Sequence, residues 1–257
     1  NIKTDHKSDS PDALDLLDNV IASIYEDEEG KLWVGTWGKG MSIIDRKTNE
    51  ATHYQSQLTG ERHIPENHVH VIFRDSQSRV WLGTRNGVSI LDRSVKRFVP
   101  VEVYFDAPDF NYFTNNRVYC IIEASDHRFW IGTGNGICIL DTQTKERTIL
   151  QEGGEGPLSL SRNLIYSLLE DRDGQFWIAT SKGLDRYDPS TQQIFHYEND
   201  PESGNSLVDN FTISLCEDTR GYIWIGTSGG ISMFNKEDST FTNYTTFDGL
   251  PSNIIYD

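Results

Sequence analysis

The sequence has no long apolar run and little positive charge. No stretch of 18 apolar residues occurs, and no basic segment followed by an apolar one opens the chain, so we expect no membrane contact by this segment. Lysine and arginine number 23 against 39 aspartates and glutamates, which gives a net charge of −16. Because a surface of that sign repels a phosphate backbone, nucleic acid is not an expected partner.

Cysteine is scarce, and the motifs of nucleotide and acyl chemistry are missing. The three cysteines are Cys120, Cys138 and Cys216, none at motif spacing, so we expect small buried hydrophobes and no disulfide framework. The sequence holds no phosphate loop in a strand-turn-helix context and no nucleophile elbow. We therefore expect no cofactor.

One phrase recurs through the chain: a tryptophan, followed two residues later by glycine or alanine and then by threonine. The five tryptophans are Trp33, Trp81, Trp130, Trp177 and Trp224, spaced 47 to 49 residues apart. A period of this length indicates a repeat architecture, in which each unit buries its apolar face by stacking on its neighbours.

Each repeat carries further signals in a fixed order. An asparagine stands fourteen residues before every repeat tryptophan: Asn19, Asn67, Asn116, Asn163 and Asn210. It opens a short run rich in β-branched and aromatic residues, which predicts a strand buried on both faces. A turn such as Asp171 to Gly174 leads to the tryptophan strand, and a second turn such as Asn86-Gly87 leads to a third strand. A fourth strand carries an aromatic residue in four of the five repeats.

The unit is thus a four-stranded antiparallel meander of the size of a propeller blade. We predict an all-β fold, a β-propeller of five complete four-stranded blades plus partial flanking strands. The first strand should lie innermost. Each repeat tryptophan should pack on the next blade, with the following glycine or alanine leaving room for it. Five equivalent copies argue against a reaction centre, so we expect no catalytic residue in this segment.

The predicted boundaries follow from these signals. The blades are 17–54, 64–98, 115–149, 162–197 and 209–244; residues 1–16 are a linker or remnant, 99–114 an aromatic-rich insertion and 250–257 the first strand of a next blade. The flanking pieces lack the two middle strands of a sixth blade. We expect either an open arc that associates with other copies or a strained five-bladed closure.

The motif resembles the two-component regulator propeller repeat. Residues 170–180, Glu-Asp-Arg-Asp-Gly-Gln-Phe-Trp-Ile-Ala-Thr, and residues 217–227 fit it closely, and the resemblance covers about residues 17 to 257. The third repeat is the loosest, with Ala124 in the aspartate position and His127 in the glycine position.

The resemblance implies the periplasmic sensor region of a hybrid two-component histidine kinase. It also implies that the five blades are a fragment of a larger seven-bladed propeller. Such regions usually sense oligosaccharides released from glycans and signal through a dimer. The expected partners are therefore an oligosaccharide or other small ligand, together with a second copy or the missing blades and a β-sandwich domain. Two alternatives stay open: a propeller enzyme, such as a lyase or glycosidase, and a protein-binding scaffold.

The candidate ligand contacts lie in the least repetitive places. They are Trp37, Tyr104, Phe105, Asp106, Asp109, Phe110 and Tyr112. Aromatic rings stack on the C–H faces of sugars, while carboxylates take hydroxyl groups. The alternative is that the insertion packs its own aromatics on the propeller or contacts a missing domain, and that Trp37 caps a blade edge.

Histidine offers one further candidate. On a strand near Asn67, His68 and His70 would share a face, an arrangement that can bind a transition metal. Innermost strands line the central channel, however, where solvated histidines are common, and we expect no metal site.

Overall fold

The computed structural model describes residues 16–113, 116–154 and 156–256 of the chain. They form five separate four-stranded antiparallel sheets, each with its strands in chain order. The strands are β1 Ile21–Glu26, β2 Lys31–Thr36, β3 Met41–Asp45, β4 Glu50–Tyr54; β5 Val69–Arg74, β6 Val80–Thr84, β7 Gly87–Asp92, β8 Arg97–Pro100; β9 Val118–Glu123, β10 Phe129–Thr133, β11 Gly136–Leu140, β12 Arg147–Leu150; β13 Ile165–Glu170, β14 Phe176–Thr180, β15 Gly183–Asp188, β16 Gln193–Tyr197; and β17 Thr212–Glu217, β18 Ile223–Thr227, β19 Ile231–Asn235, β20 Thr240–Tyr244. The predicted propeller of four-stranded blades is confirmed.

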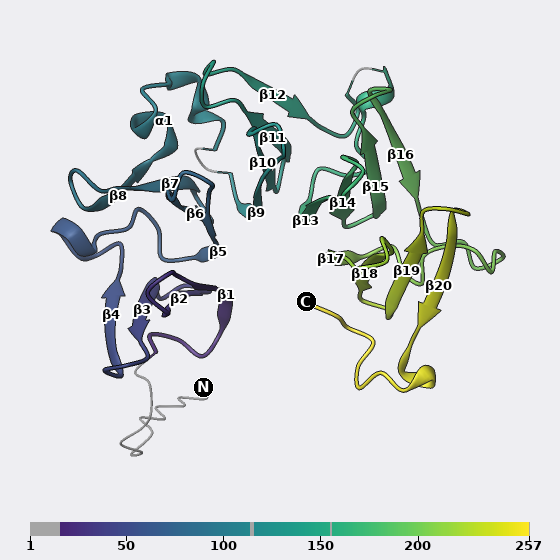
Figure 1. The fold of residues 1–257 in the computed structure, drawn as a ribbon, viewed down its shortest axis with the longest axis horizontal. Coiled ribbons are helices and arrows are strands. Elements are labelled where there is room, and N and C mark those ends of the chain that lie inside the picture. Colours follow the sequence, from purple (N-terminus) through teal and green to yellow (C-terminus); the bar gives the residue numbers. More distant parts are fainter. Residues whose placement is uncertain (1–15, 114–115, 155, 257) are drawn as a thin grey trace.

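The blades follow one another around an arc (Figure 1). The first strand of each blade faces the centre and the fourth lies at the periphery, and neighbouring first strands lie side by side. The first and last blades do not meet, and the segment that ends the chain lies between them. The open arc is therefore the arrangement found, and a five-bladed closure was wrong.

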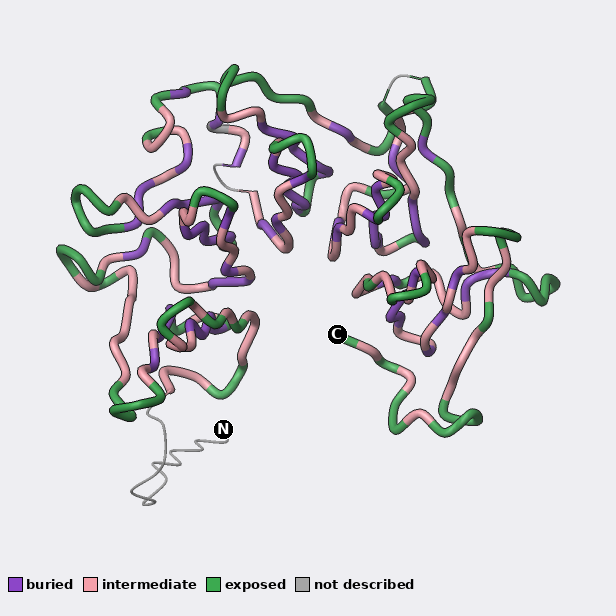
Figure 2. The backbone as a smooth tube through the Cα atoms, in the orientation of Figure 1, coloured by how far each residue is buried: buried purple, intermediate pink, exposed green. Residues whose placement is uncertain are grey.

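The core lies between blades rather than within one. Figure 2 shows buried backbone running through the sheets and exposed backbone in the outer turns. The Trp81 ring stacks on Phe129 of the next blade with 4.4 Å between ring centroids, and Trp130 stacks on Phe176 in the same way at 3.9 Å. At Gly132, an added Cβ would lie 2.8 Å from Ile165 Cγ2 of the next blade, so only a very small residue fits there.

Two repeated polar contacts fix the blade ends. The buried threonine of each motif donates its hydroxyl to a carbonyl of the following hairpin, as Thr84 Oγ1 does to Gly87 O at 3.0 Å. The repeat asparagine ties a blade to the one before it, because its Oδ1 accepts a backbone N–H from the loop that leaves the preceding blade. These pairs are Asn67 with Ser56 at 2.8 Å, Asn163 with Glu152 at 2.7 Å, Asn210 with Asn199 at 2.6 Å and Asn253 with Thr246 at 2.7 Å.

Outside the blades, the described structure differs from the prediction in two places. The insertion begins later than expected, because Val99 and Pro100 belong to β8, and it forms helix α1 Val101–Tyr104 and the 3-10 helix η2 Pro108–Phe113. Residues 250–256 form no strand, since no second strand lies beside them in the described residues. Ile255 still donates its N–H to Thr227 O at 3.0 Å and packs over Gly226, which is the place that Ile165 takes over Gly132.

The remaining elements are short 3-10 turns. They are η1 Gly60–Arg62, η3 Gly156–Leu158 and η4 Thr246–Asp248. Of the predicted linker at residues 1–16, residues 1–15 lie outside the described residues. Within the described part of the chain, no helix is long and apolar enough to span a membrane.

Candidate functional site

The insertion between the second and third blades is largely committed to packing. Phe110 and Phe113 are fully buried and join Val101, Trp81 and Phe129 in one core cluster. Phe110 was predicted as a ligand contact, and this is corrected here: its ring has no exposed surface to offer. The physical reason is that a short insertion of α1 and η2 gains more by covering the apolar edge of the second blade than by standing out in water.

The other aromatic candidates of the insertion also have protein partners. The Phe105 ring lies 5.9 Å from the Trp81 ring, and the Arg79 guanidinium lies 5.2 Å over Phe105. Tyr104 packs edge-on against Phe105 at 5.0 Å. Tyr112 donates its hydroxyl to Asn135 O at 2.5 Å, and burial raises the pKa of this phenol. These rings hold the insertion to the propeller.

The two aspartates of the insertion lie at its surface. Asp106 takes a left-handed backbone conformation, with φ 49°, and its carbonyl accepts a hydrogen bond from Lys145 Nζ at 3.1 Å. Asp109 is exposed. The structure does not bring either of them together with Trp37, which lies on the first blade.

Trp37 is the first member of a row of rings that crosses all five blades. Its indole is 48% exposed and packs edge-on against His70 at 4.6 Å. His70 lies 5.5 Å from Tyr119, Tyr119 lies 5.5 Å from Tyr166, and Tyr166 lies 5.0 Å from Phe211. We call these five residues the aromatic row. Each blade contributes one ring, so neighbouring rings belong to neighbouring blades.

The innermost strands produce this row through a shared irregularity. In β5, Val69 pairs with Thr84 and Val71 with Gly83, which leaves His70 as the extra residue of a β-bulge. The same register shift occurs around Tyr119 in β9 and around Tyr166 in β13. A bulge re-aims the side chain of its extra residue. These innermost strands face the central space (Figure 1), so the bulges set the three rings along the inner rim of the arc.

His70 is the most unusual member of the aromatic row. It is only 7% exposed, and in the described residues neither ring nitrogen has a hydrogen-bond partner. Burial, followed by the nearby Arg117, lowers the pKa of His70 to about 4. The imidazole is therefore neutral at neutral pH and offers one donor and one acceptor. A buried polar group without a partner destabilises the folded chain by on the order of 1–3 kcal/mol. Such a group is therefore typical of a position that serves function and not stability.

Basic side chains surround the His70 end of the row. Arg117 donates through Nη1 to Tyr119 Oη at 3.1 Å, and Arg85 follows the motif threonine of the second blade. His68 Nδ1 lies 3.1 Å from Glu66 Oε1, so His68 and His70 have different surroundings. In the described part of the chain, no three histidine, cysteine or acidic side chains gather in a way that could hold a metal ion.

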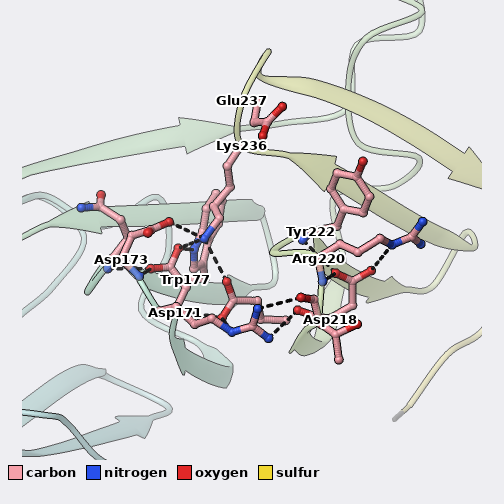
Figure 3. Close-up of polar contacts among 12 residues, drawn as sticks. Asp171, Asp173, Trp177, Asp218, Arg220, Tyr222, Lys236 and Glu237 are labelled. Atoms are coloured by element: carbon pink, nitrogen blue, oxygen red, sulfur yellow. Dashed lines mark hydrogen bonds and ion pairs between the residues drawn. The ribbon is translucent and has the colours of Figure 1, made fainter.

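A cleft of about 460 Å³ lies elsewhere, between the last two blades. Lys236 Nζ lies 2.6 Å from Asp173, 2.9 Å from Glu217 and 3.2 Å from Asp171 (Figure 3). Burial disfavours the charged ammonium, but hydrogen bonds with the three carboxylates outweigh it and raise the pKa of Lys236. A similar cleft lies between the first two blades, where Arg74 Nη1 of the second blade pairs with Glu28 Oε1 of the first at 2.8 Å. We interpret both as ion-pair contacts between blades.

Comparison with known proteins identifies the repeat. The chain matches the two component regulator propeller family at residues 15–38, 63–86, 112–135, 159–182 and 206–229. The chain belongs to the two-component regulator propeller family. Every match contains one repeat asparagine and one repeat tryptophan, so the family's own motif is the one that builds these blades.

Relatives of this two-component regulator propeller chain are much longer than the chain itself. It is 28% identical over 110 residues to histidine kinase P4 of Formosa agariphila, which covers 41% of the chain but 8% of the kinase. Its fold is similar to the extracellular domain of a putative hybrid two component system from B. thetaiotaomicron, with TM-score 0.74 and 23% identity over 92% of the chain and 30% of that domain. Virginiamycin B lyase from Staphylococcus aureus shares the fold more distantly, with TM-score 0.60 and 14% identity over 88% of the chain and 70% of the lyase.

The aromatic row was missed by sequence reasoning, apart from Trp37. A signal was nevertheless present in these propeller repeats. His70, Tyr119 and Tyr166 each stand three residues after the repeat asparagine, at a position that the motif leaves free. A ring at the same free position in three successive repeats predicts neighbouring rings once the blades are known to stand side by side.

Proposed function

We propose that this chain is the ligand-sensing propeller segment of a two-component regulator of the hybrid histidine kinase type. The five family repeats and the similarity to a histidine kinase support this role. The fold that it shares with an extracellular domain supports a place outside the cytoplasm, and we propose the periplasm. The segment binds and does no chemistry of its own.

We propose that the ligand is an oligosaccharide bound along the aromatic row. One observation carries this proposal: five rings from five blades form a continuous line, and it is partly open to solvent. Trp37 is 48% exposed and Phe211 38% exposed, while Tyr119 and Tyr166 are half-buried. Aromatic faces pack on the C–H faces of sugar rings, and a line of them suits a chain of sugars better than a single compact ligand.

Calorimetry with a panel of oligosaccharides tests the proposal. We expect binding heat without turnover, and an affinity at least about tenfold lower for Trp37→Ala and Tyr166→Ala, since a stacked ring contributes on the order of 1.5 kcal/mol. Phe247→Ala is the control, because Phe247 is 99% exposed and lies outside the row. Product formation would identify a propeller enzyme instead. The absence of binding across the panel would favour a protein-binding scaffold.

We also propose that signalling involves self-association through an open blade face. On the last blade, Trp224, Leu215, Ile231 and Ile255 line an apolar cleft of about 160 Å³. Cys216 lines it too and is exposed, which corrects the expectation that all three cysteines are buried. The reason is that no following blade covers this face in the described structure.

Light scattering on a concentration series tests the association. We expect the mass to rise with concentration and to fall to that of a monomer in Leu215→Glu, because a buried charge without a partner destabilises an apolar contact. Val103→Glu, an exposed apolar residue of the insertion, is the control. A monomer at every concentration would contradict the dimer.

A further inference from the structure

The aromatic row has basic side chains beside its second and third rings, His70 and Tyr119, and a carboxylate beside its fifth ring, Phe211. Arg85 and Arg117 flank His70 on the second and third blades, and in the described residues neither arginine forms an ion pair with a carboxylate. At the other end, the Asp209 carboxylate accepts from Phe211 N and Ser228 Oγ, both at 2.7 Å. Two uncompensated guanidinium groups are notable in a chain of net charge −16.

The carboxylate nearest to the basic end is already committed. Glu66 Oε1 accepts from Asn67 N at 2.7 Å, from His68 N at 3.1 Å and pairs with His68 Nδ1 at 3.1 Å. Arg117 is held in turn, because it donates to Tyr119 Oη and its guanidinium carbon lies 5.9 Å from the Tyr119 ring centroid. A guanidinium fixed on an aromatic ring keeps free N–H groups in the fork geometry that matches a carboxylate or a sulfate.

We propose that the aromatic row binds an acidic oligosaccharide, with a carboxylate or sulfate of one sugar against Arg117 and Arg85 and the following sugars stacked toward Tyr166 and Phe211. The inference rests on the proposed function and names its substrate class. The two arginines and Asp209 together set the direction of the ligand. The anionic unit lies at the second and third blades, and Asp209 repels it from the fifth.

Matched ligand pairs test this proposal on the full 257-residue chain. The probes are an oligogalacturonide and the same chain with its carboxylates reduced to alcohols, together with a sulfated oligosaccharide and its desulfated form. We expect the acidic oligosaccharide of at least one pair to bind at least about tenfold more tightly than the neutral one of the same pair. Its affinity should fall as the salt concentration rises. The pair that shows this difference tells whether the recognised group is a carboxylate or a sulfate.

Substitutions of the two arginines test whether they recognise the charge of the ligand. Arg117→Gln and Arg85→Gln should each weaken the acidic ligand about tenfold or more and leave the neutral ligand unchanged. Lys47→Gln, at an exposed turn of the first blade, removes the same charge away from the row and should have no effect. Melting curves of each variant show whether it is folded.

The possible failures point to different errors. If neutral and acidic chains bind equally, or if Arg117→Gln behaves like Lys47→Gln, the acidic preference is wrong while the sensing of oligosaccharides stands. If Tyr166→Ala also leaves the binding of all sugars unchanged, the aromatic row is not the site. If no sugar of either charge binds, the acidic preference and the proposed oligosaccharide ligand are both overturned.

Discussion

The indole Nε1 of Trp81 donates a hydrogen bond to Asp75 Oδ2 at 2.8 Å, and Asp75 stands six residues earlier in the same blade. The same bond joins Trp33 to Asp27, Trp177 to Asp171 and Trp224 to Asp218. The other oxygen of Asp75 accepts the turn amides of Gln77 and Arg79. One aspartate thus closes the turn and fixes the indole that packs on the next blade.

The third blade departs from this rule. Ala124 takes the aspartate position, and Trp130 Nε1 is buried without a hydrogen-bond partner in the described residues. The Trp130 ring keeps its packing nevertheless, stacked on Phe176. Packing therefore positions the ring, and the aspartate satisfies its polar edge. Two predictions follow from this pair of roles.

Removal of the aspartate should be costly. We expect Asp75→Ala to lower the free energy of unfolding by about 3 kcal/mol, because it leaves a buried indole N–H and two turn amides without their acceptor. Urea unfolding measures the change. Glu50→Ala, at an exposed position, is the control and should stay within about 0.5 kcal/mol. Equal stability of the two variants would contradict the role given to Asp75.

Restoring the aspartate should have the opposite effect. We expect Ala124→Asp to raise the free energy of unfolding by about 1 kcal/mol, since the new carboxylate gives Trp130 Nε1 an acceptor. The gain should be smaller in a Trp130→Phe background, which has no indole N–H but keeps the turn amides. A double-mutant cycle measures this coupling. A gain of the same size in both backgrounds would show that the indole is not involved.

The small residue after the tryptophan should be replaceable only at a cost. At Gly132 an added Cβ would approach Cys120 Sγ of the same blade to 2.4 Å and Ile165 Cγ2 of the next blade to 2.8 Å, so we expect Gly132→Ala to destabilise the chain by about 1–3 kcal/mol. At Gly204 an added Cβ meets no atom within 4 Å, and Gly204→Ala is the matched control. Thermal unfolding compares the two. An unchanged melting temperature in Gly132→Ala would show that the neighbouring strands can move apart without loss of stability.

His70 should make stability depend on pH. Its pKa is about 4 in the folded chain against 6.5 when unfolded, because burial and then Arg117, His68 and Arg85 disfavour the charged ring, while Glu66 acts in the opposite direction. Between these pH values the unfolded chain binds more protons, so stability is full above pH 6.5 and falls as pH falls toward 4. We expect a loss of about 2 kcal/mol between pH 7 and pH 5, absent in His70→Phe.

The wild type has to be compared with variants because His196 changes the stability with pH in the opposite direction to His70. Its hydrogen bond to Asp185 raises the pKa of His196 in the folded chain, so its contribution is present below pH 6.5 and is lost as pH rises. Urea unfolding of the wild type, His70→Phe and His196→Phe at pH 5 and 7 separates the two. The assignment to His70 fails if His70→Phe keeps the slope of the wild type.

The sequence by itself determined the blades. The repeat asparagines, aspartates and tryptophans act within one blade or on its immediate neighbour, and each appears in nearly every copy, so their spacing was enough to predict five four-stranded sheets. The role of Asp75 as a turn residue was readable in the same way. Its bond to Trp81 was not, because strand pairing had first to bring the indole over the turn.

Only the tertiary structure decided where ligand contacts can lie. The sequence marked the insertion by its aromatics, but burial of Phe110 depends on the apolar surface that the second blade presents to it. The aromatic row joins residues as far apart as Trp37 and Phe211, because the blades stand side by side. Its three middle rings are residues of β-bulges in the innermost strands. Local patterns fix hydrogen bonds within a strand or turn, whereas the distance between side chains of different blades is set by the angle at which those blades pack.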